Sequence, residues 1–75
     1  MNRSTNLQDV FLNFVRKEKI NVVITLVNGS PISGIIKGFD NFVVIVESLG
    51  TQHLLYKHAI ASIMPEKKVN ISINE

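Results

Sequence analysis

Cysteine is absent from the 75-residue chain, which excludes disulfide bonds and thiolate metal sites. The two histidines, His53 and His58, cannot complete a four-ligand zinc site by themselves, so we expect no bound metal ion. The longest unbroken apolar run, from Phe42 to Val46, is far shorter than the roughly 20 residues that span a bilayer. The first six residues also lack the hydrophobic core of a signal peptide, so we predict a cytoplasmic location.

The motifs of common enzyme classes are missing as well. The sequence contains no Gly-x-Ser-x-Gly turn, no pair of neighbouring acidic residues and no Gly-rich phosphate loop. An enzyme with His58 or His53 as base, Ser48 or Ser62 as nucleophile and Asp40 as the orienting group is an alternative that we do not favour. We therefore predict that the chain is not an enzyme.

Small size combined with high apolar content indicates an oligomer. A chain of 75 residues forms one domain at most, and such a domain buries only about 60% of its unfolded surface. Hydrophobic residues nevertheless make up 45% of the chain. With disulfides and metal excluded, association with other subunits is the remaining way to bury that surface. A net charge of +2 is weak for one chain, but a symmetric oligomer multiplies it.

A helical pattern comes first in the chain. Between residues 7 and 19, apolar side chains recur every three or four positions. Thr5 and Gln8 have the spacing of a capping box, with Asn6 as an alternative cap. Cations follow toward residue 19, where they interact favourably with the helix dipole. We predict a helix over 7–19.

After residue 19 the apolar period changes to two, which indicates β-strands. We predict five short strands, separated by turn residues such as Asn28-Gly29 and Asp40-Asn41, over 20–27, 32–39, 42–48, 52–56 and 59–64. Gly34 and Gly38 within the second strand indicate a bulge, a bend or a close backbone approach.

The expected fold is mostly β: an N-terminal helix followed by a strongly bent five-stranded antiparallel sheet, or small open barrel. We expect residues 1–6 to be a flexible segment, 7–65 to be the domain and 66–75 to be a polar tail. An open sheet has two free edges, and these can pair between subunits. Head-to-tail pairing of this kind closes into a ring when the rotation per subunit divides a full turn.

A polar cluster, Tyr56-Lys57-His58-Ala59-Ile60, interrupts the apolar pattern between the last two strands. Adjacent residues of a strand point to opposite faces, so a loop is needed for Lys57 and His58 to serve one site. Such a loop suits a ligand that stacks on rings, accepts hydrogen bonds and carries negative charge. RNA has all three properties.

Three ordered motifs in this chain resemble the bacterial Sm-like RNA chaperone family Hfq. They are the helix Leu7-Gln8-Asp9 with Phe11-Leu12-Asn13, the segment from Leu26-Val27-Asn28-Gly29 through Gly34 to Phe39-Asp40 and Phe42-Val43, and the cluster Tyr56 to Ile60. The resemblance covers about 7–65. It implies a cytoplasmic homohexameric ring of Sm folds that pairs small regulatory RNAs with messenger RNAs, without catalysis and without a cofactor.

The resemblance assigns a uridine-binding site to the proximal face of the ring. Phe42 could otherwise be a core aromatic, but the resemblance implies that it stacks on uracil. Lys57 would donate to a uracil carbonyl, and His58 would reach the RNA near the pore. Gln8 and Asn41 match positions that contact the bound nucleotide. The implied proximal site therefore consists of Gln8, Asn41, Phe42, Lys57 and His58.

Two further surfaces are implied by the same resemblance. A lateral rim that contacts RNA corresponds to Asn13, Arg16, Lys17 and Lys19, which by charge alone could simply keep a helix end soluble. A distal face that binds adenine-rich RNA corresponds to Thr25, Asn28, Gly29, Ser30, Ser33 and Gln52. Thr25 and Ser30 offer little area for stacking, so we expect adenine-rich RNA to bind more weakly than uridine-rich RNA.

Two non-enzymatic alternatives remain. A small β-barrel that assembles only with protein partners would explain the apolar excess, but it gives Phe42, Lys57 and His58 no role. A helix-turn-helix that binds DNA needs two helices, and the sequence predicts only one.

Overall fold

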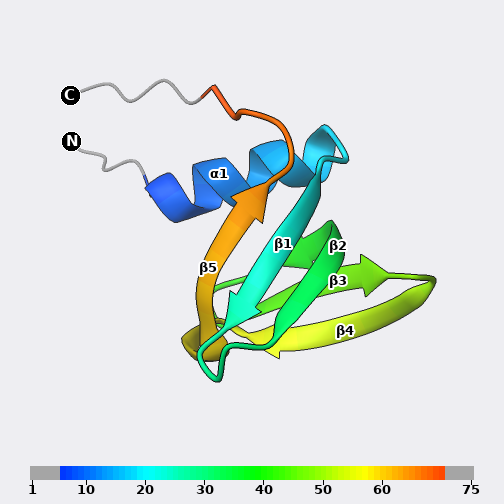
Figure 1. Ribbon diagram of the computed structural model, residues 1–75. Coiled ribbons are helices and arrows are strands. Elements are labelled where there is room, and N and C mark those ends of the chain that lie inside the picture. Colours follow the sequence, from blue (N-terminus) through cyan, green and yellow to red (C-terminus); the bar gives the residue numbers. More distant parts are fainter. Residues whose placement is uncertain (1–5, 71–75) are drawn as a thin grey trace.

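The computed structural model describes residues 6–70, which form one α-helix packed on a bent antiparallel sheet (Figure 1). In chain order the elements are α1 (Leu7–Lys17), β1 (Asn21–Leu26), β2 (Pro31–Phe39), β3 (Val43–Ser48), β4 (Thr51–Tyr56), a 3-10 turn (Lys57–Ala59) and β5 (Ile60–Pro65). The strands pair in the order β4-β3-β2-β1-β5. This architecture confirms the predicted fold class of a helix followed by five antiparallel strands.

The start of α1 has a side-chain cap. The Asn6 side chain accepts a hydrogen bond from the Asp9 backbone N–H at 3.3 Å, which satisfies one of the free donors of the first turn. Asn6, the alternative cap, is therefore the N-cap. The other proposed cap, Thr5, lies outside the described residues.

The end of α1 differs from the prediction, because the helix stops at Lys17 rather than at Lys19. Lys19 has a left-handed backbone with φ 54°. The Ile20 N–H donates to the Val15 carbonyl at 3.0 Å and the Lys19 N–H donates to the Arg16 carbonyl at 3.3 Å. This is the Schellman arrangement, which closes a helix and reverses the chain. The reversal lets β1 begin at Asn21, directly beneath the helix end.

The second strand is where the sheet bends. The pairing of β2 with β3 shifts register between Ile36 and Gly38, so Lys37 is an extra residue on β2. A bulge of this kind kinks the strand and increases its twist. Gly34 lies earlier in β2 and opposite the Glu47 carbonyl, where a Cβ atom would come within 2.2 Å of the oxygen. The two glycines thus correspond to the predicted bulge and the predicted close approach.

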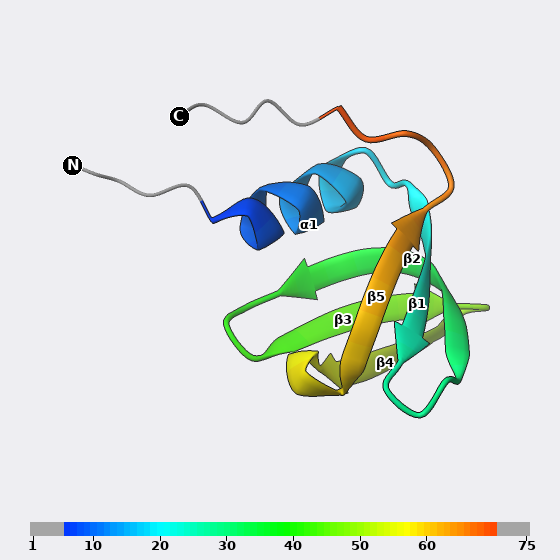
Figure 2. The same cartoon turned by 60° about the vertical axis from the view of Figure 1, so that its left-hand side comes forward.

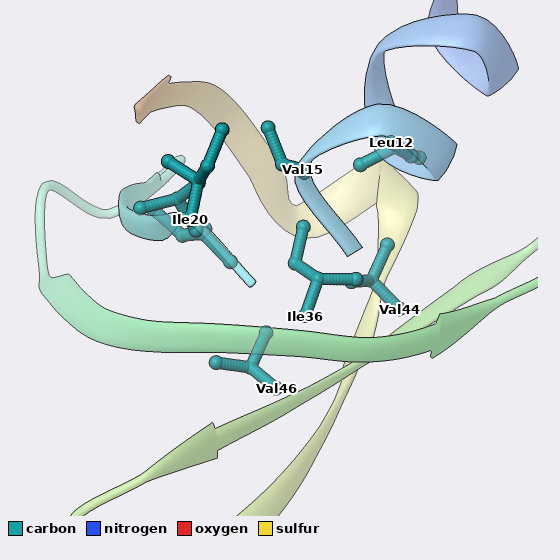
Figure 3. Close-up of a cluster of buried hydrophobic side chains, with 8 residues drawn as sticks. Leu12, Val15, Ile20, Ile36, Val44 and Val46 are labelled. Carbon is teal, nitrogen blue, oxygen red and sulfur yellow. The ribbon is translucent and has the colours of Figure 1, made fainter. Parts of the chain in front are cut away.

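The core lies between α1 and the concave side of the sheet (Figure 3). Its side chains come from α1, from the turn after it and from three strands, and at most 7% of any of them is exposed: Leu12, Val15, Ile20, Val22, Ile24, Ile36, Val44 and Val46. On the strands these residues alternate with half-buried ones, as expected for a sheet with one covered face. The burial fixes the register of β1, β2 and β3.

The segment that follows β5, residues 66–70, folds back beside the turn between α1 and β1 (Figures 1 and 2). We refer to it as the strap. The Glu66 N–H donates to the Asn21 carbonyl at 2.9 Å, and the Asn21 side-chain amide donates to the Glu66 carboxylate at 3.0 Å. Val69 is half-buried and packs against the core. The domain boundaries at residues 6 and 65 stay predictions, although the strap is attached to the domain.

The close approach at Gly34 generates a stability prediction. We expect Gly34→Ala to lower the unfolding free energy by about 2 kcal/mol, because the added methyl must push β2 away from the β3 backbone. Gly38→Ala is the control, since its Cβ would meet no atom within 4 Å. Urea denaturation followed by circular dichroism measures both variants. Equal loss of stability in the two variants would contradict the interpretation.

Candidate nucleic-acid interface

The turn between β2 and β3 presents an aromatic ring to solvent. The Asp40 carboxylate accepts hydrogen bonds from the backbone N–H groups of Phe42 at 2.8 Å and Val43 at 2.9 Å. These two bonds, aided by the charge of Lys57, hold the pKa of Asp40 below its ordinary value. Phe42 itself is 73% exposed, so the alternative of a core aromatic is wrong.

The centre of the cluster Tyr56 to Ile60 interrupts the strands with a turn, as predicted. Lys57–Ala59 is a 3-10 turn between β4 and β5, and it removes the alternation that would have sent Lys57 and His58 to opposite faces. The Lys57 N–H donates to the Phe42 carbonyl at 2.8 Å. The exposed His58 ring stacks on Tyr56, with centroids 5.6 Å apart and planes 22° apart. One hydrogen bond thus joins the loop to the aromatic turn.

The Lys57 side chain has three neighbours. Its ammonium donates to the Gln8 side-chain oxygen at 2.5 Å, lies 4.0 Å from the Asp9 carboxylate and sits 5.7 Å from the centre of the Phe39 ring. Only 17% of the side chain is exposed. Gln8 and Lys57, separated by 49 positions in the sequence, are therefore brought together. Gln8 orients the lysine, and its proposed capping partner, Thr5, lies outside the described residues.

Asp9 and Phe39 were missed by the sequence reasoning as members of this site. Both belong to the motifs that carried the family resemblance, but neither has a local pattern that points to Lys57. The available signal was an acidic residue beside Gln8 in the first helical turn. Placing it next to a lysine of another element requires the tertiary structure.

A cavity of about 540 Å³ adjoins these residues, between α1 and β5. Its walls are mostly apolar and include Leu7, Phe11 and Ile63, and the polar side chains Gln8 and Lys57 also line it. An apolar pocket with a few converging polar groups is typical of ligand sites and of subunit contacts. Asn41 lies in the exposed turn before Phe42.

The predicted rim residues gather at the C-terminal half of α1. Asn13 accepts a hydrogen bond from the Arg16 guanidinium at 2.5 Å, so the amide orients the arginine. Lys17 and Lys19 are exposed. Although Lys19 lies beyond the helix, the left-handed turn keeps it at the same end of the molecule.

The predicted distal residues lie mainly on the hairpin of β1 and β2. Asn28 accepts a hydrogen bond from the Ser30 N–H at 2.9 Å, and Gly29 has the positive φ of 92° that the turn requires. Thr25 is half-buried opposite Pro31. Asn28 and Gly29 therefore determine the conformation of the turn between β1 and β2.

Two further distal residues sit apart from that turn. The Ser33 hydroxyl accepts a hydrogen bond from the Asn21 side chain at 2.9 Å. Gln52 lies on β4, opposite Glu47 of β3, so β3 separates it from β2 within one chain. His53 is half-buried on β4.

Residues 6–70 contain no group of three or more His, Asp or Glu side chains placed to hold a metal ion. Within the same range, no helix is both long and apolar enough to cross a membrane. The described chain also has a single α-helix, which does not supply the helix pair of a helix-turn-helix.

The family model described as Hfq protein matches residues 7–70. The chain belongs to the Hfq family. The RNA-binding protein Hfq of Carboxydothermus hydrogenoformans is 60% identical over 65 residues, which cover 87% of this chain and 76% of the relative. The RNA-binding protein Hfq of Bacillus cytotoxicus is 52% identical over 73 residues, covering 97% of this chain and 99% of the relative.

A solved Hfq structure has the same fold. The crystal structure of "the pleiotropic translational regulator, Hfq" superposes with a TM-score of 0.77 and 37% identity, over 79% of this chain and 98% of that chain. These comparisons confirm the resemblance to Hfq and the Sm-like fold. The relatives carry the names of RNA-binding proteins, which confirms that this Hfq-family chain is not an enzyme.

The Asp40 turn of this Hfq chain predicts a pH dependence. Because the folded-state pKa is below 3.8, the carboxylate stabilises the fold above about pH 4 and loses that contribution as pH falls through the lowered value. NMR titration of the Asp40 carboxyl checks the shift, and acid unfolding of Asp40→Asn checks the linkage. We expect the unfolding free energy of the Asp40→Asn variant to change less than that of wild type as pH falls below about 4. A carboxyl pKa above 3.8 would contradict the turn geometry.

Proposed function

We propose that this Hfq-family chain is a cytoplasmic RNA-binding chaperone that binds uridine-rich RNA on the proximal face of a homohexameric ring. There it promotes the pairing of small RNAs with messenger RNAs in post-transcriptional regulation. The observation that carries the proposal is the exposed Phe42 ring, joined through its backbone to Lys57. The names of the relatives support RNA as the ligand.

The chemistry of these groups suits uracil. An exposed aromatic ring stacks on a base with about 1–3 kcal/mol. Uracil has two carbonyl acceptors, which a lysine ammonium can satisfy, whereas the amino group of cytosine cannot accept a hydrogen bond. The Lys57 ammonium has three N–H donors, and its only hydrogen bond among the described residues is to Gln8. Donors therefore remain for a base.

The rest of the proximal site surrounds this pair. Gln8 and Asp9 hold the ammonium in place, so little side-chain entropy is lost when a base arrives. Asn41 and the exposed His58 provide further polar contacts. A purely structural barrel would have no use for Phe42, whose ring is 73% exposed.

The two edges of the sheet support the ring. β4 and β5 are the outer strands, and unpaired strand edges are templates for pairing with another chain. Each also carries an apolar side chain that is more than half exposed, Tyr56 on β4 and Met64 on β5. Pairing β4 of one subunit with β5 of the next would cover both edges and would surround a central pore with six copies of Lys57 and His58.

The other two surfaces take secondary roles in the proposal. Arg16, Lys17 and Lys19, with Asn13 orienting the arginine, form a rim that contacts RNA phosphates. The hairpin of β1 and β2 forms the distal face. Its residues Ser30 and Thr25 have no aromatic ring on which a base could stack. We therefore propose that adenine-rich RNA binds there more weakly than uridine-rich RNA binds at Phe42.

The ring is tested by the mass of the assembly in solution. We expect about six times the 8.4 kDa of one chain. Closure of the ring pairs every β4 and β5 edge, and the number six is the one that the family resemblance implies. Analytical ultracentrifugation, with and without a short oligouridine, measures the mass. A monomer in both samples would exclude the ring.

The binding mode is tested at Phe42. We expect Phe42→Ala to weaken binding of a short oligouridine by about 5- to 150-fold, the equivalent of one lost base stack. Fluorescence anisotropy with oligouridine and oligoadenosine measures both faces, and wild type should bind oligouridine more tightly. Binding of oligoadenosine should not change in the variant.

Leu49→Ala is the matched control for that experiment. Leu49 is also large, apolar and fully exposed, but it lies at the tip of the β3–β4 turn, away from Lys57. It should leave oligouridine affinity unchanged. If both variants weaken binding equally, or if wild type binds oligoadenosine more tightly, the proximal proposal is wrong.

A further inference from the structure

Two adjacent cations, Lys67 and Lys68, occupy the strap and are exposed. Neither belongs to the proximal site, the rim or the distal face described above. The strap that carries them is held at both ends of the lysine pair. Glu66 precedes them and makes two hydrogen bonds to Asn21, while Val69 follows them and packs against the core.

This attachment determines where the lysines lie. The pairing of β5 with β1 continues one step beyond Pro65, because Glu66 bonds to Asn21. Lys19 precedes Asn21 by two residues, and Lys68 follows Glu66 by two. Each step along the chain moves a Cα atom by about 3.8 Å, so both lysines stay within about 8 Å of the Asn21–Glu66 pair. Both views show the strap beside the turn after α1 (Figures 1 and 2).

The lysines of the strap therefore lie near Lys19, at the end of the molecule where the last turn of α1 carries Arg16 and Lys17. Two carboxylates lie in the same region, Glu18 after the helix and Glu66 in the strap. The Asn21 amide holds Glu66 at 3.0 Å, so that carboxylate is directed toward β1. The five cations outnumber these two acids, and lysine side chains are long enough to follow a flexible strand of phosphates.

We propose that Lys67 and Lys68 extend the rim into one continuous phosphate-binding surface for single-stranded RNA. This inference rests on the proposed RNA binding, and it adds a second segment of the chain to that function. The strap lysines bind the backbone of RNA that continues outward from the proximal site. They read no base, because a lysine acts on phosphate as a point charge. Their contribution is therefore independent of sequence and sensitive to salt.

The test compares two RNAs on the intact assembled protein: a short oligouridine and the same oligouridine extended by unstructured mixed-sequence RNA. We expect a Lys67→Ala, Lys68→Ala double variant to bind the short RNA as wild type does. For the extended RNA, the slope of log affinity against log salt should fall by about 1.4, because each lost phosphate contact contributes about 0.7.

Matched variants separate local contacts from net charge. Lys37→Ala also removes one exposed lysine, but from β2, where it pairs with Glu47 at 3.7 Å. It should change the slope less than Lys68→Ala does. Lys67→Arg with Lys68→Arg should keep the wild-type slope. Circular dichroism confirms that each variant is folded.

The outcomes distinguish this inference from the proposed function. An unchanged slope in the double variant overturns the strap surface, even when oligouridine binding is intact. Equal weakening of both RNAs overturns it too, because the lysines would then act through the fold or the ring. If wild type fails to bind oligouridine but the extended RNA still loses slope, the uridine site is wrong and the strap surface stands.

Discussion

The hydrogen bond from the Lys57 N–H to the Phe42 carbonyl, 2.8 Å long, is the contact on which the candidate site depends. It joins two turns that are 15 positions apart in the sequence, one between β2 and β3 and the other between β4 and β5. The Asp40 carboxylate fixes the first turn through two backbone bonds. The 3-10 turn fixes the second. Because backbone groups make these bonds, the side chains of Phe42 and Lys57 stay available for a ligand.

The helix also matters to the site, because its packing on the sheet positions two residues that contact Lys57. Its apolar stripe covers the sheet and buries Leu12 and Val15 almost completely, which sets the position of the first helical turn. That turn carries Gln8 and Asp9 to the Lys57 ammonium. Core packing on one face of α1 therefore orients a cation on another. A substitution that changes the volume of a core side chain would shift α1, and so would move Gln8 and Asp9 relative to the Lys57 ammonium.

Local patterns predicted most of the elements, because strands and helices are specified by apolar period and by turn residues. The interruption at Lys57 and His58 was also visible, since it breaks a period of two. The helix end was placed two residues late, because lysine is an unusual residue for the left-handed position that Lys19 adopts. Asp9, Phe39 and the Asn21–Glu66 pair could not be predicted, since each contact joins residues that only the tertiary fold brings together.

The two faces of the sheet differ in how their polar groups are used, and this difference supports the proposed preference for uridine over adenine. On the distal hairpin, the Asn28 oxygen is bonded to its own turn and the Ser33 oxygen to Asn21. Those contacts build the hairpin and the attachment of the strap. Around Phe42 the turns are satisfied by backbone groups and by Asp40, which leaves a ring and an ammonium for the ligand.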